Sequence, residues 1–158
     1  MTRAKIKIED CPELREDLDA EYEGASQVQL CRYALALARH MLEVAGYVGD
    51  GWPVLKEAFA VNEQWQRGEA RMHDVRQAGF RVHELAKVAD DPIQGTALRV
   101  AGQAVGTGHM REHAMVASDY AVKTVNLMHP GDLAAVRTER HWQIEHLCAA
   151  KDMSDEAT

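Results

Sequence analysis

The chain lacks the features that mark a sheet sandwich or a membrane protein. Only 6% of its 158 residues are aromatic, so its core has to be built mainly from Ala, Val, Leu and Met, which favour closely spaced helices. No apolar run approaches about 18 residues, the length of a membrane span. The N-terminus also lacks the apolar stretch that a secretory signal needs. We therefore expect a soluble protein that has no membrane as a partner.

The cysteine content argues against a disulfide scaffold. The three cysteines, Cys11, Cys31 and Cys148, form no CxxC pair. An odd number of cysteines without a secretory signal is typical of a reducing cytosol. We therefore expect a cytoplasmic protein in which Cys31 is a small apolar core residue.

The net charge of −7 is unevenly distributed along the chain. Residues 1–23 contain eight acids and four bases, whereas residues 24–150 contain fourteen acids and thirteen bases. An acidic segment repels nucleic acid, which is not expected as a partner, and can steer a basic protein. Glu16, Asp17 and Asp19 are therefore candidate partner contacts, and solubility alone is the other interpretation of these charges.

Apolar residues recur every three or four positions along almost the whole chain, as in amphipathic helices. Two neighbouring apolar stripes predict a central helix over residues 28–45. Glycine, proline and aspartate then separate further helices at about 53–67, 69–89, 92–108, 110–127 and 133–150. The sequence predicts an all-α, single-domain bundle of about six helices. Its parts are an acidic N-terminal segment (1–25), a helical domain (26–150) and a flexible acidic tail (151–158).

Two local patterns give more specific predictions. Ile6 and Ile8 alternate with lysines near the N-terminus, which is a weak strand signal, while Leu14 and Leu18 suggest one or two acidic helical turns. In the last predicted helix, one face carries an arginine among apolar side chains. This face, which we expect to point into the core, consists of Leu133, Val136, Arg140, Ile144 and Leu147.

His109, Glu112 and His113 match the HxxEH order of inverted zinc proteases. Histidines four residues apart lie on one face of a helix and can share a metal ion, with Glu112 as the base. That protease class also needs a downstream acidic ligand and a larger fold, and only 45 residues follow the motif. We therefore predict no catalytic residue and no cofactor. The alternative is a metal-binding protein or metal-dependent hydrolase that uses His109 and His113 as ligands.

Glycines and tryptophans suggest where elements or partners meet. Gly102 and Gly106 each cost about 1 kcal/mol relative to alanine within a helix, so close packing should require them. If that packing is between chains, the protein is a self-associating helical scaffold such as a homodimer, and the sequence does not separate the two cases. Trp52, in a glycine-rich loop, is a candidate partner contact. Trp142 either packs against another element or contacts a partner.

Four blocks of the sequence share their order and spacing with a known protein family. Residues 53–69 are similar to its P-(x)4-A-(x)6-W-x-x-G-E block, and residues 99–114 to its R-x-A-G-Q-A-(x)4-H-(x)3-H-A block. Residues 120–123 and 139–143 are similar to its Y-A-x-K and E-R-x-W-Q blocks. The motif residues are Arg99, Gly102, Gln103, His109, His113, Tyr120, Lys123, Glu139, Arg140 and Trp142. Over about residues 30–147 the chain resembles the immunity proteins of bacterial polymorphic toxin systems, in the group like immunity protein type five.

The resemblance implies an all-helical bacterial protein that is encoded beside a toxin. It further implies that the chain neutralises this toxin by direct contact and has no catalytic activity of its own. The chain departs from the family pattern at Trp52 and Val54, where basic residues are expected around the proline. The resemblance therefore does not extend to contacts made by that loop.

Overall fold

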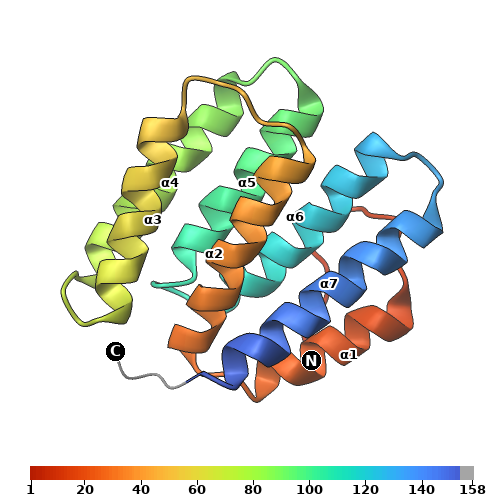
Figure 1. Cartoon of the computed structure of the whole chain (residues 1–158), viewed down its shortest axis with the longest axis horizontal. Helices are drawn as coiled ribbons and strands as arrows, with labels where there is room; N and C mark the ends of the chain where they lie inside the picture. The colour runs from red at the N-terminus through yellow and green to blue at the C-terminus, as the bar shows by residue number, and fades with distance from the viewer. Residues whose placement is uncertain (154–158) are drawn as a thin grey trace.

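The computed structural model describes residues 1–153, which form one compact all-α domain with seven helices and no strand. Residues 154–158, most of the predicted acidic tail, lie outside the described residues. Successive helices run alternately up and down (Figure 1). The helices are α1 (Pro12–Glu23), α2 (Gln27–Val44), α3 (Trp52–Gln66), α4 (Met72–Val88), α5 (Pro92–Gly106), α6 (His113–Met128) and α7 (Leu133–Lys151). The all-α prediction is confirmed, and the count of about six is one too low.

The additional helix, α1, lies in the acidic N-terminal segment. It begins with Pro12, which fits a first helical position because no backbone N–H is needed there. Leu18 and Tyr22 are buried, and α1 packs against α7. Residues 1–11, here called the strap, lead into α1 and contain no strand, so the strand signal of Ile6 and Ile8 was misleading. α1 therefore shares its core with the rest of the bundle.

α2 is central to the fold, as its two apolar stripes predict. Ser26 and Gln29 form a capping box at its start, which satisfies backbone N–H groups that have no partner within the helix. Nine of its side chains are buried, and α2 packs against α3, α5, α6 and α7. Among the described residues, no helix has the length and apolar character needed to cross a bilayer.

α4, α5 and α6 pack closely at the two glycines of α5. A Cβ atom on Gly102 would lie 2.5 Å from Cε1 of His83, a side chain of α4. A Cβ atom on Gly106 would lie 3.3 Å from Cδ2 of His113, at the start of α6. Both glycines are buried within the chain, so close packing between its own helices accounts for them.

The predicted core face of α7 is correct at its centre and wrong at its start. Val136, Arg140 and Leu147 are buried, whereas Leu133 is 48% exposed. Leu133 is the first residue of the helix and directly follows the turn 129–132, so it lies at the edge of the bundle. Ile144 is half-buried.

Candidate functional site

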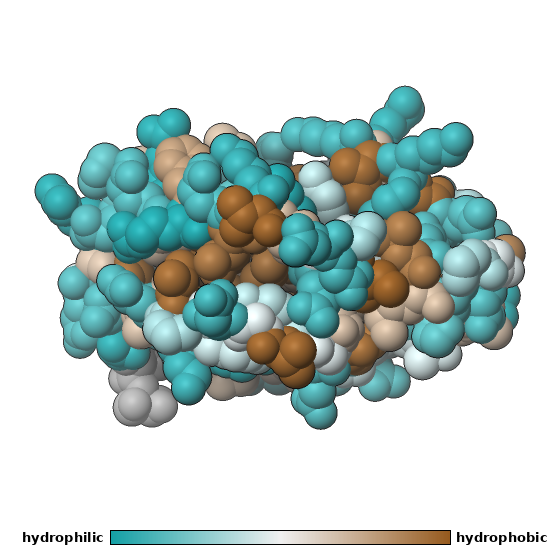
Figure 2. All heavy atoms as spheres, turned by 90° about the horizontal axis from the view of Figure 1, so that it is seen from above, coloured by the Kyte–Doolittle hydropathy of each residue, from teal (hydrophilic) through white to brown (hydrophobic). Residues whose placement is uncertain are grey.

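Three connections between helices lie at one end of the bundle, the upper end in Figure 1. This loop end consists of residues 45–51, 89–91 and 129–132. Val48 is 85% exposed and Val88 is 76% exposed. Figure 2 looks onto this end and shows apolar side chains gathered around a hollow, with hydrophilic ones beside them. Apolar patches rimmed by polar groups mark protein–protein contact sites.

A cavity of about 350 Å³ opens at the loop end beside Val88. Its walls include the apolar side chains of Leu85 and Leu98. Asp50, Asp90 and Asp91 also line it, whereas no lysine, arginine or histidine does. The cavity therefore combines apolar walls with an acidic rim.

The carboxylates at this rim are available to a partner to different degrees. Asp91 caps α5, because its side chain accepts a hydrogen bond of 2.8 Å from the backbone N–H of Ile93. The side chains of Asp50 and Asp90 make no hydrogen bond or ion pair within residues 1–153. Unpaired surface carboxylates attract lysine and arginine side chains and accelerate encounter with a basic protein. The loop end is thus suited to a basic protein surface.

Trp52 lies next to the loop end, at the first position of α3. Its ring is tilted against that of Tyr47, with centroids 5.6 Å apart. The Tyr47 hydroxyl accepts a hydrogen bond of 3.1 Å from the backbone N–H of Gly51. Trp52 is half-buried, so it contributes more to the shape of this loop than to the exposed surface.

The acidic candidates on α1 divide between surface and interior. Glu16 and Asp17 are exposed. Asp19 is only 3% exposed, and its carboxylate accepts hydrogen bonds from the backbone N–H of Thr2 and from Arg15. Burial alone would raise the pKa of Asp19, but the hydrogen bonds from Thr2 and the charge of Arg15 lower it below its usual value. Asp19 is therefore engaged within the fold, and its burial argues against its use as a partner contact.

Trp142 is packed between two imidazole rings. The His40 ring, from α2, stacks on it with centroids 3.9 Å apart, and the His146 ring stacks on it at 3.7 Å. The Nε2 atom of His40 also lies 2.8 Å from a carboxylate oxygen of Glu139. Of the two interpretations of Trp142, packing against another element describes the structure.

Arg140, another residue of the E-R-x-W-Q block, is completely buried in a network of charged groups. Its guanidinium donates hydrogen bonds of 2.9 and 2.7 Å to Asp10 of the strap and one of 2.9 Å to Asp119 of α6. Asp119 also pairs with Arg15 of α1, at 2.9 Å. The sequence analysis did not connect Asp10 and Asp119 with Arg140, because no spacing rule links residues 10, 119 and 140.

The long motif of α5 and α6 also makes contacts inside the fold. Arg99 lies 3.2 Å from Nδ1 of His83, and the side chain of Gln103 is hydrogen-bonded to Nδ1 of His113. Burial, followed by the positive charges of Arg99 and neighbouring groups, lowers the pKa of His83 to about 4. The imidazole of His83 is therefore neutral at pH 7.

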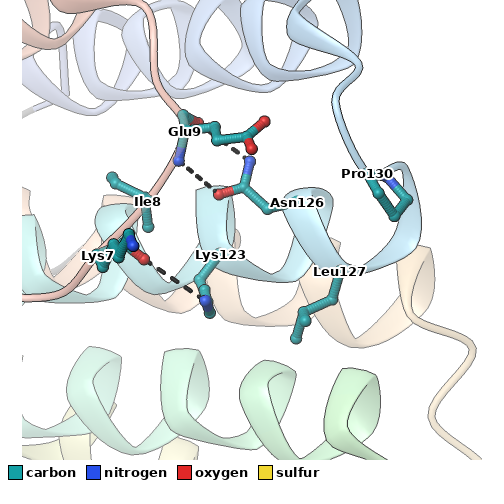
Figure 3. A pocket seen from close by; sticks show the side chains of 7 residues that line it. All are labelled: Lys7, Ile8, Glu9, Lys123, Asn126, Leu127 and Pro130. Carbon is teal, nitrogen blue, oxygen red and sulfur yellow. Dashed lines mark hydrogen bonds between the residues drawn. The ribbon is translucent and has the colours of Figure 1, made fainter.

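The Y-A-x-K block holds the strap against α6. Figure 3 shows Lys123 donating to the backbone carbonyl of Lys7, at 3.5 Å. Beside it, Asn126 exchanges two hydrogen bonds, of 2.8 and 3.0 Å, with the backbone of Glu9. Tyr120, one turn before Lys123, is half-buried. Lys123 and Asn126, together with residues 7–9 of the strap, line a surface cavity of about 370 Å³ between the strap and the end of α6.

The HxxEH motif does not lie on one helix. α5 ends at Gly106 and α6 begins at His113, so His109 lies in the turn between them. The rings of His109 and His113 meet edge to face, with centroids 4.8 Å apart, and Glu112 is exposed. No group of three or more His, Cys, Asp or Glu side chains in residues 1–153 is placed to hold a metal ion. The geometry gives no support to the hydrolase alternative.

Comparison with known proteins gives one match. A family model described as Imm-5 like putative immunity protein matches residues 20–150. No curated protein and no solved structure matches the chain. The matched range contains all the motif residues described above. It leaves out the strap and most of α1, although Arg140 and Asn126 within it bind the strap.

Proposed function

The chain belongs to the Imm-5 like putative immunity protein family, and from this premise we propose that it binds a cognate protein toxin at the loop end and neutralises it by direct contact. One observation carries the choice of surface: Val48 and Val88 are exposed beside a cavity that is lined by three aspartates and no base. The family motifs supply no competing surface, because most of their side chains are engaged within the fold.

The chemistry of the loop end indicates a toxin with a basic, partly apolar face. Full burial of a valine contributes roughly 1.5–3 kcal/mol, so Val48 and Val88 are suited to the centre of a contact. Asp50 and Asp90 are suited to pair with lysine or arginine at its rim, where complementary charge sets specificity and association rate. Neutralisation then requires that the contact covers or distorts the active site of the toxin, and it requires no catalysis by the immunity protein.

The exposed acids of α1 have a separate role in this proposal. Glu16 and Asp17 add to the negative potential that a basic toxin meets as it approaches. Because this attraction acts before contact, it affects the association rate more than the dissociation rate. The two acidic regions therefore predict different kinetic effects.

The test uses the toxin domain that this proposal expects to be encoded beside this chain's gene. Binding kinetics are measured for the wild-type chain and for Val48→Asp/Val88→Asp. We expect the double variant to dissociate about a hundredfold faster, which corresponds to about 2.7 kcal/mol. Met72→Asp, which changes an exposed apolar residue at the other end of α4, is the matched control and should bind normally. Equal dissociation rates for the wild type and the double variant would refute the loop end as the binding surface.

A second pair of variants separates steering from contact. Glu16→Lys/Asp17→Lys should slow association and weaken its dependence on salt, with little change in dissociation. An unchanged association rate would refute steering by α1 and leave the loop end untouched. The proposed function itself is wrong if a stoichiometric excess of the wild-type chain leaves the toxic activity unchanged.

A further inference from the structure

A second cavity lies at the opposite end of α4 from the loop end. It has a volume of about 360 Å³ and is lined by Met72, His73, Arg76, His109 and Met110. Two Met–His pairs, one at the start of α4 and one in the turn between α5 and α6, thus face the same cavity. We call it the Met–His cavity. The proposed immunity function makes no use of it.

The donors at this cavity have an unusual composition for a metal site. Met72 and Met110 offer thioether sulfurs, and His73 and His109 offer imidazole nitrogens, whereas no carboxylate or thiolate lines the cavity. Thioethers are soft ligands that select Cu(I), and imidazole also binds copper. Mg²⁺ and Ca²⁺ prefer oxygen ligands, which these side chains do not provide. We propose that the Met–His cavity binds one Cu(I) ion through the thioethers of Met72 and Met110 and the imidazoles of His73 and His109.

Arg76 is the one charged residue at the cavity, and its position limits repulsion of a cation. Its guanidinium carbon lies 5.2 Å from the centre of the Phe80 ring, one turn further along α4. The face of an aromatic ring attracts such a charge, so the guanidinium already has a partner in the Phe80 ring.

The Met–His cavity is open to an entering ion, and one of its ligands, His109, is held in place by neighbouring side chains. Met72 is 59% exposed and Met110 is 49% exposed, so an ion can reach both sulfurs without opening the core. The flexible methionine side chains can adjust around it. The ring of His113 packs edge to face against that of His109, and His113 is in turn held by Gln103. Such outer contacts orient metal-ligating histidines.

The experiment measures Cu(I) binding directly. The full chain is prepared in a Cys148→Ser background, because Cys148 is the one cysteine that is not buried and its thiol would compete for copper. Under anaerobic, reducing conditions the protein competes for Cu(I) with a chromogenic chelator. We expect one ion per chain. The same titration with Zn(II) should give clearly weaker binding.

Sulfur ligation is tested with variants that preserve volume. Met72→Leu/Met110→Leu removes both sulfurs at little cost in packing, and it should weaken Cu(I) binding by at least about tenfold. Met128→Leu, at the other end of the bundle, is the matched control and should bind like the parent. Circular dichroism should show the same helical content for all three proteins. His73→Gln/His109→Gln should weaken binding as Met72→Leu/Met110→Leu does.

Three results would each overturn the proposal. One is the absence of saturable Cu(I) binding by the parent protein. Another is Cu(I) binding that is unchanged in Met72→Leu/Met110→Leu. The third is Zn(II) binding as tight as that of Cu(I). Because no toxin enters these titrations, their failure leaves the proposed immunity function unaffected.

Discussion

Replacing Arg140 by methionine should destabilise the protein strongly while preserving the apolar part of the side chain. The guanidinium is completely buried and makes three hydrogen bonds to the carboxylates of Asp10 and Asp119. Removing one partner of a buried ion pair leaves the other charge uncompensated, at a cost of about 3–5 kcal/mol. Asp119 keeps its pairing with Arg15, and Asp10 is 15% exposed. We therefore expect Arg140→Met to lose about 3 kcal/mol of its free energy of unfolding, near the lower limit of this range.

The free energy of unfolding is measured by urea denaturation, monitored by circular dichroism. Arg39→Met is the matched control, because Arg39 pairs with Glu63 on the surface, where both side chains are about half exposed. Exposed pairs contribute about 0–1 kcal/mol, so this variant should unfold close to the wild type. Asp10→Asn removes one charge but leaves Arg140 paired with Asp119, and should cost about 1–2 kcal/mol. A loss below about 1 kcal/mol for Arg140→Met would refute the argument that the network depends on its charge.

Two further predictions concern the contact between α4 and α5. The pKa of His83 is about 4 in the fold and 6.5 when unperturbed, so its contribution to stability is complete above pH 6.5 and is lost as the pH falls toward 4. Between pH 6.5 and pH 4, His83→Gln should therefore lose less free energy of unfolding than the wild type, as measured by urea denaturation. An equal loss in both proteins would show that other groups cause the loss of stability at low pH. Gly102→Ala places a Cβ atom 2.5 Å from the His83 ring, and the midpoint of urea denaturation should show a loss of about 1–3 kcal/mol. Gly95 lies in the same helix, but a Cβ atom added there would have its nearest neighbour at 3.5 Å. Gly95→Ala should therefore raise the free energy of unfolding by up to about 1 kcal/mol. A change of the same sign in both variants would contradict the packing described.

Helical periodicity predicted most of the fold because burial imposes it directly. The stripes of α2 and the proline and aspartate that start α5 are local signals, and the structure agrees with both. α1 was predicted only as one or two helical turns, because its buried apolar residues, Leu18 and Tyr22, are interspersed with acids that made the segment look like a solvated surface. The HxxEH spacing suggested a shared metal site for His109 and His113, and it was misleading for a different reason. Four-residue spacing places histidines on one face only within a continuous helix, and here the turn at 107–112 intervenes.

The candidate site was harder to predict than the fold. The sequence blocks that supported the family resemblance include Arg99, Gln103 and Arg140, all of which make contacts inside the protein. A motif of this kind indicates the scaffold and says little about the partner-binding surface. The loop end is formed by three connections that are far apart in sequence, and Val48 or Val88 alone has no distinguishing pattern. Its combination of exposed valines and unpaired aspartates becomes visible only when the connections meet at one end of the bundle.

The most direct test of the central claim is growth of cells that express the proposed cognate toxin domain together with this chain. Wild-type chain and the Met72→Asp control should restore growth, whereas Val48→Asp/Val88→Asp, produced at the same level and equally folded, should not. Growth arrest despite an excess of folded wild-type chain would contradict the immunity function. Full protection by the double variant would show that the toxin is bound elsewhere than at the loop end.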